Sequence, residues 1–278
     1  MQQLSNPYPI PWYRSPWALG AGALLGGLAV GGLVAGVARL RRRAAALPPA
    51  DCSQVGQSEG YIAGIRYLER IRGNAGPEEP LPMVIVFHSR GASPEGFAGM
   101  LGGIGRARLI LPEGDYQSGG ARAWFSLPIR DAVHGDPGPV TAQWRDTADR
   151  IHNFIGQAIQ CRPTIGRPVV TGSSQGAEMS LLLASTAPDL IASAVAVNGW
   201  LLPAFWTPNM SPTTMYNGTG DEVVPFTWAQ DYASQMQAQG APLSFVPFPS
   251  EGHAVTKAMS SAWINAVEAA VADAAAAA

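Results

Sequence analysis

The segment Gly172-Ser173-Ser174-Gln175-Gly176 places a serine between two glycines at the G-x-S-x-G spacing of a nucleophile turn. A β-branched run, RPVV, precedes it, and a stretch of helical composition, AEMSLLLAST, follows it. A turn between a strand and a helix exposes the central hydroxyl and directs the free N–H groups of the helix start towards developing negative charge. The pattern therefore predicts Ser174 as the nucleophile of an acyl transfer.

A serine hydroxyl needs a base that takes its proton, and the base needs an acid that orients it. His253, in SEGHAV, follows a strand that ends near Phe248, and Asp221, in YNGTGDEVVPF, follows another predicted strand. Loops at the carboxyl ends of parallel strands meet at one edge of the sheet, and the order Ser, Asp, His is the one expected there. We predict a Ser174–His253–Asp221 triad, with Glu222 as the alternative acid.

The other three histidines fit other roles. His152 falls within a predicted helix, where it is a surface or partly buried residue. His134 lies in a loop, DAVHGDPGP, with no matching context. His88 directly follows the apolar run MVIVF and opens the loop His88-Ser89-Arg90-Gly91.

Alternating strand and helix signals must hold these loops in place. Residues 61–71 alternate like an early antiparallel strand, and residues 83–88 and 107–114 are apolar runs typical of buried parallel strands. Four later strands are predicted in RPVVTG, IASAVAVNG, TTMYNGTGD and LSFVPFPSEGH, and helices over 140–160, 176–186, 227–239 and 254–274. This alternation predicts an α/β fold with a mostly parallel, doubly wound sheet.

Taken together, five segments resemble the α/β-hydrolase superfamily, and within it the phospholipase/carboxylesterase group that includes acyl-protein thioesterases. They are GSSQGAEMSL, VFHSRGASPEGF, ARAWFSL, GTGDEVVPF and EGHAV, which span residues 83–255. The resemblance implies an α/β-hydrolase fold, acylation of Ser174, proton transfer by His253 and orientation of His253 by Asp221.

The resemblance also implies an oxyanion hole made by the backbone N–H groups of Gln175 and Arg90. The family usually has His-Gly-x-Gly where this chain has His88-Ser89-Arg90-Gly91, so Ser89 replaces a glycine in the loop that carries the second donor. His88 and Ser89 are expected beside the substrate. Trp124 and Phe125 either line an acyl pocket or pack in the core.

The N-terminal part of the chain has a different composition. Residues 15–38 are 24 consecutive residues without a charge, long enough for a helix that crosses a bilayer. Aromatic residues precede this segment and a cluster of arginines ends it, as at membrane interfaces. We predict an N-terminal flank over 1–14, a single transmembrane helix with its basic flank over 15–43, a linker over 44–58 and the catalytic domain over 59–278. Three GxxxG spacings favour a homodimer: Gly22/Gly26, Gly27/Gly31 and Gly32/Gly36.

Two alternatives concern this segment. The first is a cleaved signal peptide, with AAA at 44–46 as the cleavage site, although a signal peptide has its positive charges before the apolar run and here the arginines follow it. A lipoprotein signal in LPPADC fits less well, because Asp51 stands where a small residue is expected before Cys52. The positive-inside rule favours a cytoplasmic catalytic domain, and the periplasmic or extracellular side is the alternative. Cys52 and Cys161 form either one disulfide outside or two thiols inside.

Composition limits the remaining functions. The net charge of −2 comes from 20 acidic and 18 basic residues, and the arginines beyond the N-terminus are scattered, so no nucleic acid partner is expected. No metal or organic cofactor is expected either. We predict a membrane-anchored serine hydrolase that cleaves small-molecule or lipid esters or thioesters. The alternatives are a polyester depolymerase, a feruloyl-type esterase or a peptidase on the same scaffold, and a catalytically silent, membrane-anchored binding module.

Overall fold

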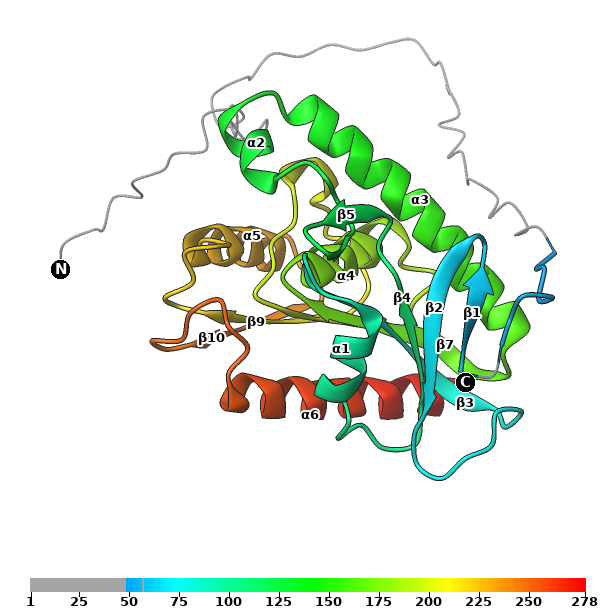
Figure 1. Cartoon of the computed structure of the whole chain (residues 1–278). Coiled ribbons are helices and arrows are strands. Elements are labelled where there is room, and N and C mark those ends of the chain that lie inside the picture. Colours follow the sequence, from blue (N-terminus) through cyan, green and yellow to red (C-terminus); the bar gives the residue numbers. More distant parts are fainter. Residues whose placement is uncertain (1–48, 57) are drawn as a thin grey trace, which may run out of the picture.

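The computed structural model describes residues 49–56 and 58–278, which fold around one eight-stranded sheet (Figure 1). The strand order is β1-β2-β4-β3-β7-β8-β9-β10; the β1–β2 and β2–β4 pairs are antiparallel, and the other neighbouring strands are parallel. The predicted mostly parallel sheet is therefore confirmed. Its strands are β1 (Glu59–Ile62), β2 (Ile65–Ile71), β3 (Leu81–Phe87), β4 (Arg108–Pro112), β7 (Thr164–Ser173), β8 (Ser193–Val197), β9 (Thr213–Gly218) and β10 (Leu243–Phe248).

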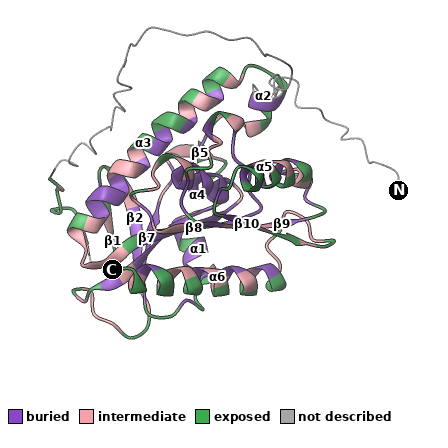
Figure 2. Ribbon diagram, turned by 180° about the vertical axis from the view of Figure 1, so that it is seen from behind, coloured by how far each residue is buried: buried purple, intermediate pink, exposed green. Residues whose placement is uncertain are grey.

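Helices cover both faces of the sheet, as Figure 1 shows. One face packs against α3 (Pro137–Cys161), α4 (Gln175–Thr186) and α5 (Phe226–Ala238), and the other against α1 (Pro94–Met100) and α6 (Lys257–Ala276). Buried residues line the sheet and nearly all of α4, whereas α6 is exposed on its outer side (Figure 2). The three-layer arrangement leaves the loops at the carboxyl ends of the strands free to form a site.

Local sequence explains where the first strands begin and end. Residues 61–71 are not one strand, as predicted, but the β1–β2 hairpin. Ala63 and Gly64 form its two-residue turn with φ values of 51° and 77°. Positive φ at both positions is typical of the turns that match the twist of a hairpin.

The helix starts follow capping chemistry. The side chain of Asp136 accepts a hydrogen bond from Gly138 N, and Pro137 occupies the first turn of α3. The Thr256 hydroxyl caps α6 by accepting from Met259 N. The predicted helices over 140–160 and 254–274 are confirmed within a few residues. Five short elements were not predicted from the sequence: α1, α2 (Ile129–His134), the 3₁₀ turn η1 (Pro203–Phe205), and the two strands of a hairpin, β5 (Tyr116–Ser118) and β6 (Ala121–Ala123).

A disulfide joins Cys52 to Cys161 at the end of α3, across 109 positions of sequence. Beside it, Gly56 O accepts hydrogen bonds from Arg162 and from the Tyr67 hydroxyl. Part of the predicted 44–58 linker is thus fixed to the domain, and the folded unit begins before residue 59.

The predicted transmembrane helix over 15–43 lies outside the described residues. Within 49–56 and 58–278, no helix has the length and apolar character needed to cross a membrane.

Candidate active site

Ser174 lies in a sharp turn between β7 and α4. Its φ of 54° and ψ of −123° are unusual for a residue with a side chain, and such strain is typical of a nucleophile turn. The turn packs against the end of β3: a Cβ on Gly172 would lie 2.5 Å from Phe87 O, and one on Gly176 would lie 2.0 Å from the same atom. Both glycines of the motif are therefore required by close backbone contact.

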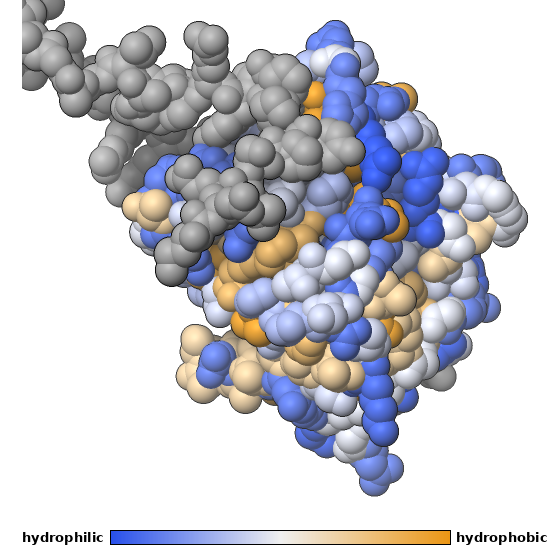
Figure 3. All heavy atoms as spheres, turned by 90° about the vertical axis from the view of Figure 1, so that its left-hand side faces the viewer, coloured by the Kyte–Doolittle hydropathy of each residue, from blue (hydrophilic) through white to orange (hydrophobic). Residues whose placement is uncertain are grey.

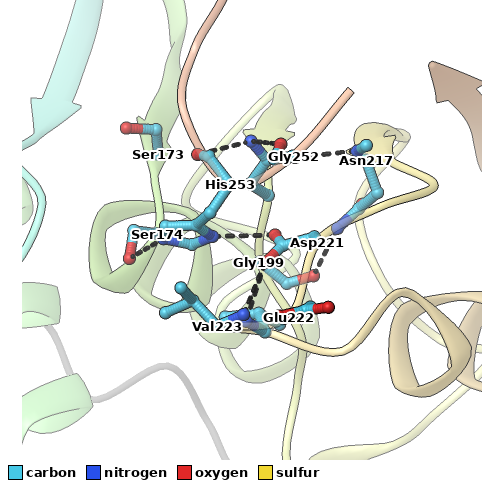
Figure 4. A network of polar contacts seen from close by, with 12 residues as sticks. Ser173, Ser174, Gly199, Asn217, Asp221, Glu222, Val223, Gly252 and His253 are labelled. Atoms are coloured by element: carbon cyan, nitrogen blue, oxygen red, sulfur yellow. Dashed lines mark hydrogen bonds and ion pairs between the residues drawn. The ribbon is translucent and has the colours of Figure 1, made fainter. Parts of the chain in front are cut away.

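The structure brings Ser174, His253 and Asp221 together, as Figure 4 shows. His253 Nε2 lies 3.0 Å from Ser174 Oγ, and His253 Nδ1 lies 2.7 Å from Asp221 Oδ2. Because the carboxylate can only accept, Nδ1 carries the proton and Nε2 is free to accept the proton of the serine hydroxyl. The serine, base and acid are thus in hydrogen-bond contact in the order that nucleophilic catalysis requires.

The acid is held by its own loop. Asp221 Oδ1 accepts from Val223 N at 2.9 Å and from Val224 N at 3.0 Å, and the carboxylate is fully buried. Glu222, the alternative acid, is exposed, and its carbonyl accepts a hydrogen bond from Arg130 of α2. The geometry therefore favours Asp221 as the partner of His253.

The loop after β3 has a fixed peptide orientation. His88 Nε2 accepts from Gly114 N at 2.9 Å, so Nδ1 is the protonated nitrogen and donates to Ser89 O at 2.8 Å. The 89–90 peptide is planar and trans, so the Arg90 N–H points away from the held Ser89 carbonyl. This N–H has no acceptor within 49–56 and 58–278 and is available to a ligand.

Gln175 is the first residue of α4, where a backbone N–H has no partner within the helix. Its side chain is 8% exposed and points into the protein, where Oε1 accepts from Trp124 N and Nε2 donates to Phe125 O. Gln175 thus fixes the 124–125 segment while its own N–H lies beside Ser174. The sequence predicted the backbone role but not this side-chain clamp.

Three of the side chains predicted near the substrate are buried in the structure. His88, Trp124 and Phe125 are fully buried; Trp124 packs against Phe87 and His88, and Phe125 stacks on Trp144. Their side chains therefore pack in the core beneath the site, which is the second of the two placements expected for Trp124 and Phe125. Burial also lowers the pKa of His88, which keeps it neutral.

Ser89 has a specific contact that a glycine could not make. Its hydroxyl lies 3.0 Å from Ser173 O, to which it donates, and 2.9 Å from Ser173 Oγ. The departure from the family pattern at this position thus ties the loop after β3 to the residue before the nucleophile.

Glu178 is a buried carboxyl group that the sequence analysis missed. It lies one turn into α4, where its N–H donates to Ser174 O, and it is 4% exposed. Burial raises its pKa from an ordinary 4.5 to about 8, against the opposing effect of the Arg90 charge. A glutamate four residues after Ser174, in a helical segment with no other charged residue, was the available signal.

Replacing Glu178 with glutamine is expected to flatten the pH dependence of stability. Between about pH 4.5 and 8, Glu178 keeps its proton in the folded state but has lost it in the unfolded state. The free energy of unfolding therefore falls as pH rises through this window, by up to ~1.4 kcal/mol per pH unit. Glutamine has no proton to lose. Urea unfolding at several pH values, with the exposed Glu222→Gln as control, measures this. Equal slopes in wild type and Glu178→Gln would contradict the expectation.

The remaining histidines lie away from the triad contacts. His152 is on α3 and its Nε2 contacts the Thr186 hydroxyl at 3.1 Å, while His134 ends α2. His152 lies in a helix, as predicted, whereas His134 was predicted in a loop and is instead the last residue of α2.

The profile of the phospholipase/carboxylesterase family matches residues 71–269. An acyl-protein thioesterase 1 of Gibberella zeae is 28% identical over 111 residues, which are 37% of this chain. The chain spans about half of that relative, 47% of its length.

Solved structures share the fold. A Bacillus cereus carboxylesterase superposes with a TM-score of 0.61 at 13% identity, over 74% of this chain and 94% of its own. Acyl-protein thioesterase 2 of Zea mays gives a TM-score of 0.53 at 15% identity, over 74% and 99% of the two chains. At these identities the similarity concerns the fold, which is the α/β-hydrolase fold that the sequence resemblance implied.

Proposed function

Because the chain belongs to the phospholipase/carboxylesterase family of α/β-hydrolases, we propose that it is a serine hydrolase that cleaves carboxylic ester or thioester bonds through an acyl-enzyme. The single observation that carries this proposal is the unbroken contact from Ser174 through His253 to Asp221, at 3.0 and 2.7 Å. The activities of the relatives, an esterase and thioesterases, agree with it.

In the first half of the reaction, Ser174 Oγ attacks the carbonyl carbon while His253 Nε2 takes the hydroxyl proton. The tetrahedral intermediate collapses, the bond to the alcohol or thiol breaks, and His253 gives its proton to that leaving group. In the second half, water attacks the acyl-serine, His253 takes a proton from the water, and the carboxylic acid leaves as Ser174 regains its proton. Asp221 stabilises the imidazolium in both halves.

Negative charge on the carbonyl oxygen requires donors that are already in place. The backbone N–H groups of Gln175 and Arg90 have the properties needed: each lies beside Ser174 or on the facing loop, and neither is used within the part of the chain that the structure describes. The Gln175 side chain and the His88 ring hold the two backbone segments in place, so the N–H groups need little rearrangement when charge develops on the carbonyl oxygen. Loss of one such donor typically raises the barrier by ~3 kcal/mol.

The surface beside the site favours apolar acyl groups. Val223, two residues after Asp221, lies beside Ser174 and Asp221 (Figure 4) and is 56% exposed. Figure 3 shows the face of the molecule that lies at the left of Figure 1, on which apolar residues, in orange, lie together with polar residues around them. An ester or thioester with an aliphatic acyl chain suits this surface better than a peptide, whose backbone needs polar partners.

The test uses p-nitrophenyl esters from acetate to laurate, matching acyl thioesters and a fluorophosphonate that modifies active serines. The full chain is expected to hydrolyse the esters and to carry the phosphonyl group on Ser174. Preference along the series identifies a short-acyl or a lipid-directed enzyme. Absence of both hydrolysis and labelling would leave the binding-module alternative.

We also propose that the segment over 15–43 is a transmembrane helix that anchors the chain in a membrane. Its support is the uncharged segment over 15–38 and the arginines that follow it, and the glycine spacings within that segment support self-association. For the side of the membrane, the Cys52–Cys161 disulfide outweighs the arginine count, because disulfides persist in oxidising compartments and are rare in the cytosol. We therefore propose that the catalytic domain lies on the periplasmic or extracellular side, which was the alternative to the cytoplasmic side favoured by the arginines.

Thiol trapping in intact cells is expected to find both cysteines protected. The chain has two cysteines, so a polyethylene-glycol maleimide should add nothing after acid quenching and two groups after reduction. Cys52→Ser is the matched control, because it leaves Cys161 free to react once. Modification of both cysteines before reduction would instead place the domain in the cytoplasm.

A further inference from the structure

The end of β8 contacts the loops of all three triad residues. This strand lies between β7, which leads to Ser174, and β9, which leads to Asp221. The carbonyl of its last residue, Val197, accepts a hydrogen bond from Ser174 N at 3.0 Å, and the next residue, Asn198, donates from its backbone to Tyr216 O at 2.8 Å. Asn198 thus stands at the centre of the sheet edge that carries the site.

The side chain of Asn198 joins the acid loop to the base loop. It is fully buried, with Oδ1 accepting from Gly218 N at 3.0 Å and Nδ2 donating to His253 O at 2.9 Å. A longer contact of 3.4 Å reaches Gly252 O. The amide oxygen therefore holds Gly218, the last residue of β9 and three positions before Asp221, and the amide nitrogen holds the backbone carbonyl of His253.

The two loops depend on this junction because they touch by backbone. A Cβ on Gly218 would lie 2.3 Å from Glu251 O and 2.5 Å from Gly252 O, and Gly220 N donates to Glu251 O at 2.8 Å. Figure 4 shows Gly252 and His253 lying against the segment that carries Asp221. A shift of either loop would alter both contacts of the imidazole.

We propose that Asn198 is a positioning residue that sets the distance between the base and the acid of the triad. The proposal rests on the proposed function, since it concerns how the His253 ring is held between Ser174 and Asp221. Asn198 touches no reacting atom. It acts through the carbonyl of His253 and the N–H of Gly218, and a misplacement of about 1 Å in such a site can cost about 100-fold in rate.

Asn198→Gly is the first variant, because Asn198 has a φ of 53° that glycine adopts without strain. It removes the amide and leaves the backbone conformation accessible. We expect kcat for an ester substrate to fall about 10- to 100-fold, with KM nearly unchanged, and the rate of fluorophosphonate labelling to fall by the same factor. Asn198→Asp keeps the volume and the acceptor for Gly218 N but faces His253 O with an oxygen, so it should show the same loss.

Asn217→Ala is the matched control. Asn217 is also fully buried and lies in β9, the strand next to β8; its Nδ2 contacts Gly199 O at 3.4 Å. Among the residues that the structure describes, its side chain makes no hydrogen bond to the loop of His253. It should lose stability but keep kcat. In wild type, the proton between His253 Nδ1 and Asp221 should give a low-field NMR resonance, which should shift or broaden in both Asn198 variants and stay in place in Asn217→Ala.

The outcomes separate the two proposals. If wild type is not labelled at Ser174, the proposed function fails. If wild type is labelled but either folded Asn198 variant keeps kcat within threefold, or Asn217→Ala loses as much, the positioning role is overturned. Should Asn198→Gly fail to fold, Asn198→Asp carries the test with the same thresholds.

Discussion

Ser174→Ala is expected to lower kcat for ester hydrolysis by about 10⁶-fold and to leave the domain folded. Alanine removes the only atom that forms the acyl-enzyme, and the turn keeps its close contacts because these involve the glycines on either side. The residual rate above the uncatalysed reaction comes from the oxyanion donors. Steady-state hydrolysis of p-nitrophenyl esters measures the loss, and urea unfolding measures stability.

His152→Ala is the control for this result. His152 is a histidine of α3 whose ring contacts Thr186, so its loss should leave turnover nearly intact. Activity in Ser174→Ala equal to that of wild type would show that another group attacks the substrate.

Asp221→Asn is expected to lower kcat by about 10⁴-fold with little change in stability. Two backbone N–H groups, of Val223 and Val224, hold Oδ1 and require an acceptor there. The amide oxygen of the variant must therefore occupy this place, so its NH₂ group faces His253 Nδ1. That nitrogen must then accept, the proton moves to Nε2, and Nε2 no longer takes the proton from Ser174.

Glu222→Gln is the matched control, since Glu222 is the neighbouring carboxylate and is exposed. It should keep wild-type kcat. NMR of ¹⁵N-labelled histidine would report the change of tautomer in Asp221→Asn directly. A loss of kcat below tenfold, or an equal loss in Glu222→Gln, would contradict the role of Asp221.

The contact of His253 with Ser174 and Asp221 could be predicted because each of the three residues follows a strand at the same edge of a parallel sheet. For Ser174, Asp221 and His253, strand signals in the chain sufficed to place the loops together. The positions that were left open or missed depend on packing between distant segments. Trp124 and Phe125 are apolar aromatics that suit a pocket as well as a core, and only the burial beneath Gln175 decides between these.

Asn198 could have been found by the rule that found the triad, because it also follows a strand at this edge. Its partners, however, are backbone atoms of two other loops, and a sequence does not show these. The pairing of Cys52 with Cys161 was undecided for a similar reason: their separation of 109 positions has no bearing on whether they meet in space.

The same disulfide determines how the domain responds to mechanical tension. β1 is an edge strand that pairs only with β2, so a pull on the chain at residue 58 would open its hydrogen bonds one after another, like a zipper. Tension applied from the N-terminal side of Cys52 is instead transmitted through the disulfide to Cys161, at the end of α3. Cys161 lies just before β7, a strand in the middle of the sheet. There many hydrogen bonds share the load, so we expect tension applied from the N-terminal side to leave the pairing of β1 with β2 intact. The candidate site lies beyond the far end of β7, away from the point of attachment.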